Sequence, residues 1–336
     1  MTMLPDSPDV QILRALLQAP GEFYSGQDLA SQLGISRVAV WKRLENLKKQ
    51  GFSIEAIRKK GYRLGSSPES ASEAGILARL PGNTNLRQLT LFDTSSSTNN
   101  DVMRLLATGA EAPLACISRR QPGGKGRRGR NWSGDFDGNL YGSLGFRPDI
   151  HPRRTGLLTL WTGLRICRRI GAITQLPIQL KWPNDLYLDG RKLAGILSES
   201  TLETERITSL VIGIGMNINM TTEDIPADLR TTATSLRIGA GHTFQLDGII
   251  AAIVEEVLGA MDDCLQGIDE DRLADEWERF ACFLGETVYV LTSDGKKNSG
   301  TLSGIDRAGS LLLRDSSGRL QSFRAGDVSL RPEPGF

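Results

Sequence analysis

The chain has 336 residues, of which 39% are hydrophobic and 24% are charged, and its formal net charge is +1. This length predicts two or three domains of a globular protein, and the balanced charge excludes a protein that is basic throughout. No apolar run is long enough to cross a membrane. We expect a cytoplasmic protein, because the first ten residues carry no basic residue and the four cysteines form no CxxC pair. The two histidines argue against a histidine-based triad or a zinc centre.

Residues 10–64 predict three helices followed by a hairpin. Apolar residues recur at helical spacing in each of the three helical stretches. Ser25 and Ser36 are expected to cap the second and third helices, and Gly34 makes the turn between them. A helix, a short glycine turn and a second helix form the helix-turn-helix pattern.

Short strands at 53–57 and 62–64 flank a basic tip, which predicts a β-hairpin wing. Residues 1–66 hold ten Lys/Arg and six Asp/Glu, so the local net charge is +4. A small helical protein-interaction module would also fit, but cations on the third helix and the wing favour DNA. The residues expected to contact DNA are Ser36, Arg37, Lys42, Arg43, Arg58, Lys59 and Lys60.

A linker of small polar residues is predicted at 65–75, before the central domain. A strand at 89–92 then leads through a hydroxyl-rich turn into a helix at 99–106. The Ser-Thr-Asn stretch at 97–99 therefore lies at a helix N-terminus, where polar side chains and free N–H groups converge. Simple helix capping is the alternative role for these residues.

The stretch 119–132, RRQPGGKGRRGRNW, places six cations within twelve positions and no acid among them. Its glycines permit close backbone approach, and cations beside exposed N–H groups make an anion-binding concavity. A solvated basic loop or a nucleic-acid tether would have a similar composition. Trp132 at one end and an apolar strand at 114–118 before the other favour a flap over a phosphate-bearing ligand. We expect this flap to be disordered until a polyanionic ligand arrives.

A strand at 178–182 ends in the sequence KWPND, so Lys181 is expected at a strand end, directed toward a ligand. Asp185 either fixes the turn or helps to hold a metal ion. A buried strand at 207–214 runs into GIGMNIN at 213–219, where small residues would let a flat ring lie close to the backbone. A tight turn is the alternative explanation for these glycines.

From residue 286 the pattern changes to short strands separated by turns. The strands are predicted at 287–291, 300–305, 311–314, 320–323 and 328–330. Five strands in about fifty residues suggest a small closed barrel. The predicted domains are therefore 1–65, 66–283 and 284–336.

Three motifs in this order resemble those of the biotin protein ligases, over nearly the whole chain. They are GKGRRGRNW at 124–132, KWPNDL at 181–186 and RKLAGIL at 191–197. The resemblance implies an α+β multidomain protein with a winged helix-turn-helix, a central α/β biotin/lipoate-ligase-like catalytic domain and an SH3-like C-terminal barrel. The helix-turn-helix is typical of the bifunctional ligases that also repress the biotin operon.

The resemblance also implies roles for individual residues. The catalytic residues would be Lys181 and Arg127. Biotin would be bound by Ser97, Thr98, Asn99, Gln121, Lys125, Gly126, Arg127, Lys181, Gly213 and Gly215. ATP or the adenylate would be bound by Gly124, Arg128, Arg130, Trp132, Lys192 and Asn217. Mg²⁺ would accompany ATP, without a metal site made by the protein alone.

The family joins biotin to a lysine of the biotin carboxyl carrier protein through biotinoyl-5′-adenylate. The resemblance therefore implies biotin, ATP, the carrier protein and the operator DNA of biotin genes as partners. It also implies a homodimer when the adenylate is bound, and no membrane. Two positions depart from the family pattern: Lys125 stands where Arg is usual, and Pro122-Gly123 where Gln-Ala is common. Lysine keeps the charge but loses the bidentate fork, which puts retention of the adenylate in question.

Three alternatives remain open from the sequence. The chain could be a ligase with a vestigial DNA-binding domain, or a ligand-sensing transcription factor without catalysis. It could also be a lipoate ligase, which shares the fold and the acyl-adenylate chemistry. Lys181 argues against pure sensing, and the flap and the C-terminal strands favour biotin over lipoate.

Overall fold

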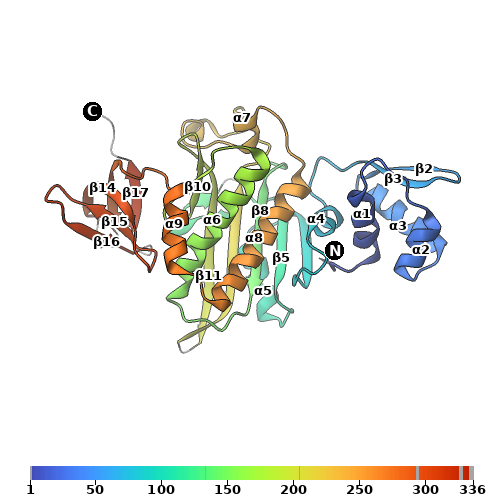
Figure 1. Ribbon diagram of the computed structural model, residues 1–336, viewed down its shortest axis with the longest axis horizontal. Coiled ribbons are helices and arrows are strands. Elements are labelled where there is room, and N and C mark those ends of the chain that lie inside the picture. Colours follow the sequence, from blue (N-terminus) through green and yellow to red (C-terminus); the bar gives the residue numbers. More distant parts are fainter. Residues whose placement is uncertain (1, 133, 204, 293–294, 325–327, 333–336) are drawn as a thin grey trace.

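The computed structural model describes residues 2–132, 134–203, 205–292, 295–324 and 328–332. Three parts follow one another along its long axis (Figure 1). A helical N-terminal part lies at one end, a large sheet covered by helices lies in the middle, and a small sheet lies at the other end. None of the described helices combines the length and the apolar character needed to cross a membrane.

The N-terminal part has the predicted order of helices and strands. It contains α1 (Pro8–Gln18), α2 (Gly26–Leu33), α3 (Arg37–Lys49), β2 (Ser53–Ile57) and β3 (Gly61–Ser66). Both predicted caps form, because the Ser25 hydroxyl accepts hydrogen bonds from two α2 backbone N–H groups and Ser36 accepts one from Ala39 N at 3.1 Å. Val40, Leu44 and Leu47 of α3 face the core, whereas Val38 and Trp41 are 63% and 52% exposed on its outer side.

Two features connect this part to the large sheet. Strand β1 (Thr2–Met3) pairs antiparallel with β4 (Gln88–Thr94). The predicted linker gives way to a helix, α4 (Glu73–Arg79), which packs against α1. Arg14 of α1 donates a hydrogen bond to the backbone oxygen of Leu77 at 3.0 Å. The winged helix is therefore attached to the central part at both of its ends.

The central sheet has eight strands in the order β1-β4-β5-β8-β12-β11-β10-β9. Its other strands are β5 (Leu114–Arg120), β8 (Leu140–Phe146), β9 (Gln179–Lys181), β10 (Asp185–Leu188), β11 (Arg191–Glu203) and β12 (Arg206–Met216). Strands β4 and β5 run parallel, and the other neighbours run antiparallel.

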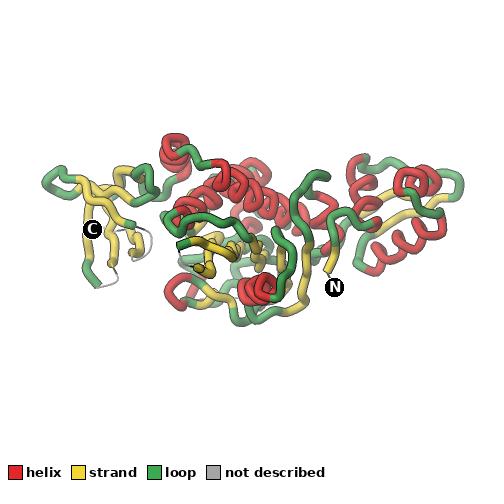
Figure 2. Tube along the Cα trace, turned by 90° about the horizontal axis from the view of Figure 1, so that it is seen from below, coloured by secondary structure: helices red, strands yellow, loops and turns green. Residues whose placement is uncertain are grey.

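Alternate residues of β5 pack on opposite faces of this sheet. Ala115 and Ile117 belong to the large core cluster beneath α6 (Arg154–Thr174) and α8 (Leu246–Gln266). Leu114 and Cys116 belong to a second cluster beneath α5 (Thr98–Ala107). The helices α6, α8 and α9 (Glu270–Phe280) thus lie together, and α5 covers only part of the other face (Figure 2). The uncovered part of that face carries the functional site.

The C-terminal part is a five-stranded antiparallel sheet in the order β16-β15-β14-β13-β17. Its strands are β13 (Thr287–Thr292), β14 (Lys297–Ile305), β15 (Leu311–Arg314), β16 (Leu320–Phe323) and β17 (Val328–Pro332), which confirms the five predicted strands. In the part of the chain that the structure describes, no ladder joins β16 to β17. The small C-terminal β domain that the sequence predicted is therefore present, as one antiparallel sheet in the described residues. Trp182 Nε1 donates to Gly309 O at 3.0 Å and so joins this sheet to the central part.

Candidate active site

The floor of the site is formed by glycines within two long strands. Gly213 and Gly215 of β12 lie opposite Leu197 and Gly195 of β11. A Cβ at Gly213 would lie 2.1 Å from Asn99 Oδ1, and one at Gly215 would lie 2.5 Å from the Trp132 ring. These two glycines lie inside a regular strand, so the tight-turn explanation is wrong. They are required because other side chains approach the sheet closely.

A row of buried polar side chains lies at the N-terminus of α5. Thr98 N donates to Gln121 Oε1 at 2.8 Å, and the Thr98 hydroxyl lies 2.7 Å from that of Ser143. Ser143 donates to Asn99 Oδ1 at 2.5 Å, and Asn99 Nδ2 donates to Glu199 Oε2 at 2.6 Å. The structure therefore joins the three predicted residues Thr98, Asn99 and Gln121 to two that were not predicted.

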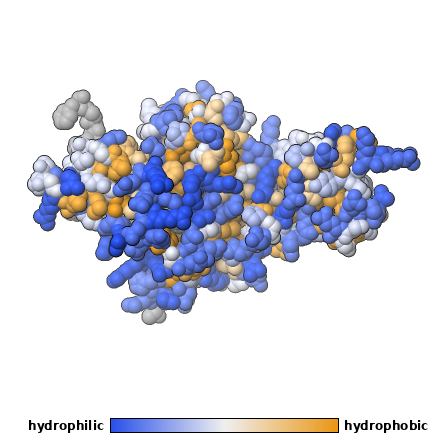
Figure 3. Space-filling view, viewed as in Figure 1, coloured by the Kyte–Doolittle hydropathy of each residue, from blue (hydrophilic) through white to orange (hydrophobic). Residues whose placement is uncertain are grey.

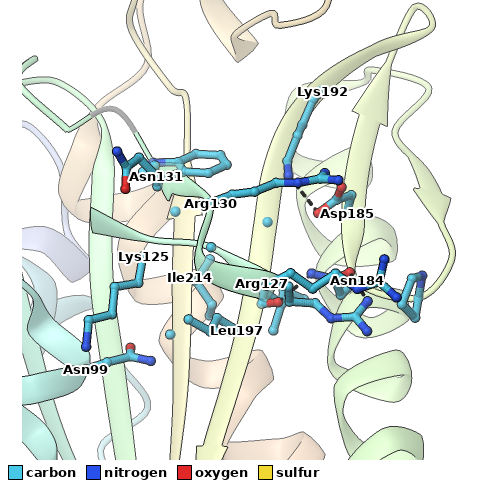
Figure 4. Close-up of a pocket in the computed structure, with 18 of the residues that line it drawn as sticks. Asn99, Lys125, Arg127, Arg130, Asn131, Asn184, Asp185, Lys192, Leu197 and Ile214 are labelled. Atoms are coloured by element: carbon cyan, nitrogen blue, oxygen red, sulfur yellow. Dashed lines mark hydrogen bonds and ion pairs between the residues drawn. The ribbon is translucent and has the colours of Figure 1, made fainter. Parts of the chain in front are cut away.

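The basic stretch folds into a short ribbon over the glycine floor. It contains β6 (Gly124–Lys125), a 3-10 turn (Arg127–Gly129) and β7 (Asn131–Trp132), and β6 pairs with β7. Lys125 Nζ donates to Asn100 Oδ1 at 2.9 Å, and Arg127 Nη1 donates to Asn184 Oδ1 at 3.1 Å. In Figure 4, Lys125 extends toward Asn99 on one side of the cavity and Arg127 lies beside Asn184 on the other. The expected disorder of this flap without ligand stays a prediction.

Arg127 is the flap cation that is most enclosed by its surroundings. Burial lowers its pKa, the charge of Asp185 raises it, and the neighbouring cations Arg128 and Arg130 lower it further. A guanidinium remains charged despite such shifts. The site therefore holds a partly buried cation that lies near two other cations, and an anionic ligand would offset both burial and this repulsion.

Lys181 ends β9 and is only 6% exposed. Its Nζ donates to Tyr187 Oη at 2.9 Å and lies 4.7 Å from the centre of the Tyr187 ring and 5.8 Å from that of Phe283. Nearby, Lys192 Nζ forms an ion pair with Asp185 at 2.8 Å and lies over the Trp132 ring at 5.3 Å. Lys192 lies within β11.

Two adjoining cavities meet at these residues. The first is bordered by the flap, the glycine floor and three members of the polar row, which are Thr98, Asn99 and Gln121. The second is bordered by Asn217, Met220, Ile225, Leu229 and residues 231–233. Both are bordered by Arg130, Asn131, Trp132, Lys181, Asp185 and Lys192. Of the predicted small-molecule site residues, Asn217 borders only the second cavity, Gly124 borders neither, and the rest border the first.

Several residues at the site were not predicted as site residues. Asn184 lies within the KWPND motif and Tyr187 lies two residues after it, so the motif could have indicated both. Ser143 and Glu199 lie in strands whose neighbours only the sheet order reveals. Leu330, from β17 of the C-terminal sheet, also borders the first cavity, and no local sequence pattern indicated this.

The site offers neither a preformed metal centre nor a reactive thiol. Across the described residues, no group of three or more His, Cys, Asp and Glu side chains could hold a metal ion. Asp185 is the one carboxylate that borders both cavities as the structure describes them. Burial raises the pKa of the Cys116 and Cys282 thiols to about 12, so neither is a nucleophile near neutral pH.

The predicted DNA surface combines cations of α3 and of the β2–β3 wing, and the wing points away from the large sheet (Figure 1). Its five exposed cations are Arg37, Lys42, Arg58, Lys59 and Lys60. The wing projects as a hydrophilic arm (Figure 3). Arg43 instead pairs with Asp9 of α1 at 3.2 Å, and the Ser36 hydroxyl caps α3. These two residues have a structural role in the free protein.

Comparisons with known proteins give consistent matches along the chain. Residues 91–217 match the Biotin/lipoate A/B protein ligase family, residues 10–63 an HTH domain and residues 283–331 the Biotin protein ligase C terminal domain. The chain is 34% identical to the Bifunctional ligase/repressor BirA of Bacillus spizizenii over 95% of this chain and 97% of that protein. It is 33% identical to the protein of the same name from Escherichia coli over 94% and 95% of the two chains.

Among solved structures, the biotin protein ligase from Aquifex aeolicus in complex with biotin and ATP is similar. The TM-score is 0.60 at 28% identity, and the match covers 73% of this chain and 99% of that one. The two bifunctional relatives therefore match this chain over nearly its whole length. The chain therefore belongs to the family of bifunctional biotin ligase/repressors.

Proposed function

We propose that this protein forms biotinoyl-5′-adenylate from biotin and ATP and then transfers biotin to a lysine of the biotin carboxyl carrier protein. One observation carries this proposal: Lys181 borders both cavities at their junction. Biotin would occupy the first cavity, with its ureido ring at the polar row. ATP would occupy the second, with its base near Met220 and Leu229.

The first step brings two anions together, because the carboxylate of biotin attacks the α-phosphate of ATP. A cation held between them stabilises the charge that develops in the transition state. Lys181 would supply this cation, because it borders both cavities, and the Tyr187 hydroxyl and ring hold its ammonium group in place. Arg127, held by Asn184, would contact the adenylate phosphate from the flap side. No covalent enzyme intermediate is needed.

A magnesium ion fits this site only as a companion of ATP. Mg²⁺ is usually held by one or two carboxylates together with substrate phosphates. Asp185 borders both cavities and could supply one such oxygen, although it is paired with Lys192. When bound, the ion would neutralise charge on the phosphates. We assign no step of the reaction to it.

The transfer step follows when the lysine amine of the carrier attacks the mixed anhydride and AMP leaves. The closed flap keeps water from the anhydride before the carrier arrives. The test is the mass spectrum of a carrier domain after incubation with the protein, ATP and biotin, beside a parallel incubation with lipoic acid. A carrier that gains only the mass of lipoyl would identify a lipoate ligase, and an unmodified carrier would contradict both assignments.

We also propose that biotinoyl-5′-adenylate acts as corepressor by stabilising a dimer that binds the operator DNA of biotin genes. Specific operators are usually bound by dimers at two half-sites. The β9 edge of the sheet is occupied by a bridge to Ala281. On the other edge, β1 pairs with Leu89 and Thr90, and Glu73 Oε1 accepts from Leu91 N at 2.9 Å.

Residues 92–94 of β4 lie on the same edge of the sheet, past the part of β4 that β1 and Glu73 cover. They lie at the root of the flap, because Ser95 N donates to Arg120 O at 3.0 Å. A flap ordered by the adenylate would therefore complete a surface at this corner of the sheet. A carrier protein docked at the same face would compete with dimerisation.

Sedimentation of the full-length protein is expected to show a mass twice as large when biotinoyl-5′-adenylate is added. The affinity for its own biotin-gene promoter should rise in parallel, because linkage makes the coupling between dimerisation, adenylate and DNA reciprocal. Double substitution of the wing cations Lys59 and Lys60 by alanine serves as control. It should remove DNA binding and leave the adenylate-dependent mass unchanged. If neither the mass nor the DNA affinity changes when the adenylate is added, the proposal is wrong. The protein would then be a ligase with a vestigial DNA-binding domain.

Substitution of Arg127 by alanine is expected to speed the release of biotinoyl-5′-adenylate about tenfold or more, because it removes one charge-assisted contact to the phosphate. The measurement is the dissociation rate in a stopped-flow chase. In the wild type, adenylate binding should protect the backbone amides of residues 121–131 from hydrogen exchange. In the variant this protection should be weaker. Arg153 lies outside both cavities, and its alanine variant provides the control. Equal protection with and without ligand would contradict the ordering of the flap.

A further inference from the structure

The polar row of the first cavity ends on Glu199 of β11. This carboxylate accepts a hydrogen bond from Asn99 Nδ2 at 2.6 Å. Glu199 itself does not border either cavity, so its effect on a ligand must pass through Asn99. The pair joins α5 to the sheet across one hundred residues of sequence.

A carboxylate oxygen can only accept a hydrogen bond, and this decides the orientation of the Asn99 amide. The nitrogen of Asn99 faces Glu199, and its oxygen therefore faces Ser143, whose hydroxyl donates to it at 2.5 Å. Gly213 leaves room for this arrangement, because a Cβ there would lie 2.1 Å from the same oxygen.

This orientation leaves the row with too few protons. Three oxygen–oxygen contacts are present, from Ser143 to Asn99 at 2.5 Å, from Thr98 to Ser143 at 2.7 Å and from Thr98 to Gln121 at 3.0 Å. The two amide oxygens have no proton to give, and each of the two hydroxyls has one. One of the three contacts therefore lacks a donor.

The opposite orientation of Asn99 would complete the row without any ligand. Its nitrogen would donate to Ser143, Ser143 would donate to Thr98, and the Thr98 hydroxyl would donate to Gln121. Glu199 prevents this, because the amide oxygen would then face the carboxylate and two acceptors would meet. Because the Ser143 proton is committed to Asn99, the Thr98 oxygen receives no hydrogen bond from the row, and it remains a buried acceptor at the edge of the first cavity.

We propose that Glu199, as a positioning residue acting through Asn99, makes this row select a ligand that donates an N–H group. The inference rests on the proposed function, because the ureido ring of biotin carries two N–H groups and the dithiolane ring of lipoic acid carries none. Thr98 borders the first cavity, whereas Ser143 does not, so a ligand N–H directed at the Thr98 oxygen supplies the incoming hydrogen bond that this oxygen lacks. The Glu199–Asn99 pair is therefore a determinant of specificity for biotin over lipoic acid.

The discriminating variant is Glu199→Gln, which keeps the size of the side chain. Its amide can accept from Asn99 or donate to it, so the orientation of Asn99 is no longer imposed. Calorimetric titration without ATP should show that biotin binds roughly tenfold or more weakly to E199Q. Binding of lipoic acid should not weaken, and kcat for adenylation at saturating biotin should stay close to that of the wild type. Glu203→Gln removes an exposed carboxylate from the same strand and should bind biotin normally.

A double-mutant cycle shows whether the effect passes through Asn99. Once Asn99→Ala has been made, E199Q should cause no further loss of biotin affinity. Losses that add in the double variant would overturn the proposal, and so would an E199Q protein that binds biotin as tightly as the wild type. If the wild-type protein itself bound lipoic acid and not biotin, the proposed function would fail instead.

Discussion

Adenylation by the Lys181→Ala variant is expected to be about 100-fold slower or worse, as for loss of a main electrostatic donor to the transition state. Lys181 borders both cavities and is nearly buried. Water is therefore not expected to stabilise the transition state in place of the missing ammonium group. The measurement is the initial rate of pyrophosphate release with biotin and ATP. The variant should still transfer biotin from synthetic biotinoyl-5′-adenylate to the carrier, because the mixed anhydride is then supplied.

Tyr187→Phe is the matched control for this experiment. It removes the hydroxyl that accepts from Lys181 Nζ and leaves the ammonium group and the aromatic ring in place. Its rate of adenylation should fall far less than that of Lys181→Ala. Pyrophosphate release at the wild-type rate from a folded Lys181→Ala protein would exclude Lys181 as the residue that joins the two substrates.

Biotin should bind roughly 100-fold more weakly to the Gly213→Ala variant, because Asn99 would have to leave its hydrogen bonds to Ser143 and Glu199. The added Cβ would lie 2.1 Å from Asn99 Oδ1, far inside the 3.0 Å that Cβ atoms keep from other heavy atoms. Affinity for ATP should change little, since Gly213 borders only the first cavity. Titration calorimetry with each ligand separates the two effects.

Two further variants distinguish a local effect from unfolding. Gly156→Ala adds the same methyl group on α6, where nothing lies within 4 Å, and should bind biotin normally. The double variant Gly213→Ala/Asn99→Ala relieves the clash, so its thermal stability should return to that of Asn99→Ala alone. Normal biotin affinity in Gly213→Ala would show that the first cavity does not hold the ureido ring.

The sequence predicted well those features that are formed by residues close to one another in the chain. The hydroxyls of Ser25 and Ser36 cap α2 and α3 because each residue directly precedes its own helix. The flap and the KWPND motif were recognisable for the same reason, since their cations, glycines and proline are close in sequence. Most of the predicted site residues consequently lie around one cavity.

The remaining features depend on which strands become neighbours. Glu199 reaches Asn99 only because β11 lies beside β12 and α5 crosses that part of the sheet. A single acidic residue in a strand carries no signal of such a pairing. Likewise, the glycines at 213 and 215 suggest a turn when they are considered alone, and only the closeness of Asn99 and Trp132 explains them.

The pairing of β1 with β4 has a practical consequence for the design of shortened proteins. The chain contributes Thr2 and Met3 to the central sheet before it forms the winged helix, and it returns through α4. A fragment that starts after the wing would lose a strand from the ligase sheet and would expose the face of α4 that α1 covers. It would therefore not be an isolated catalytic domain in its native state. An affinity tag placed before Thr2 would emerge along an edge of the catalytic sheet, so a tag at the C-terminus is the safer choice for studies of dimerisation.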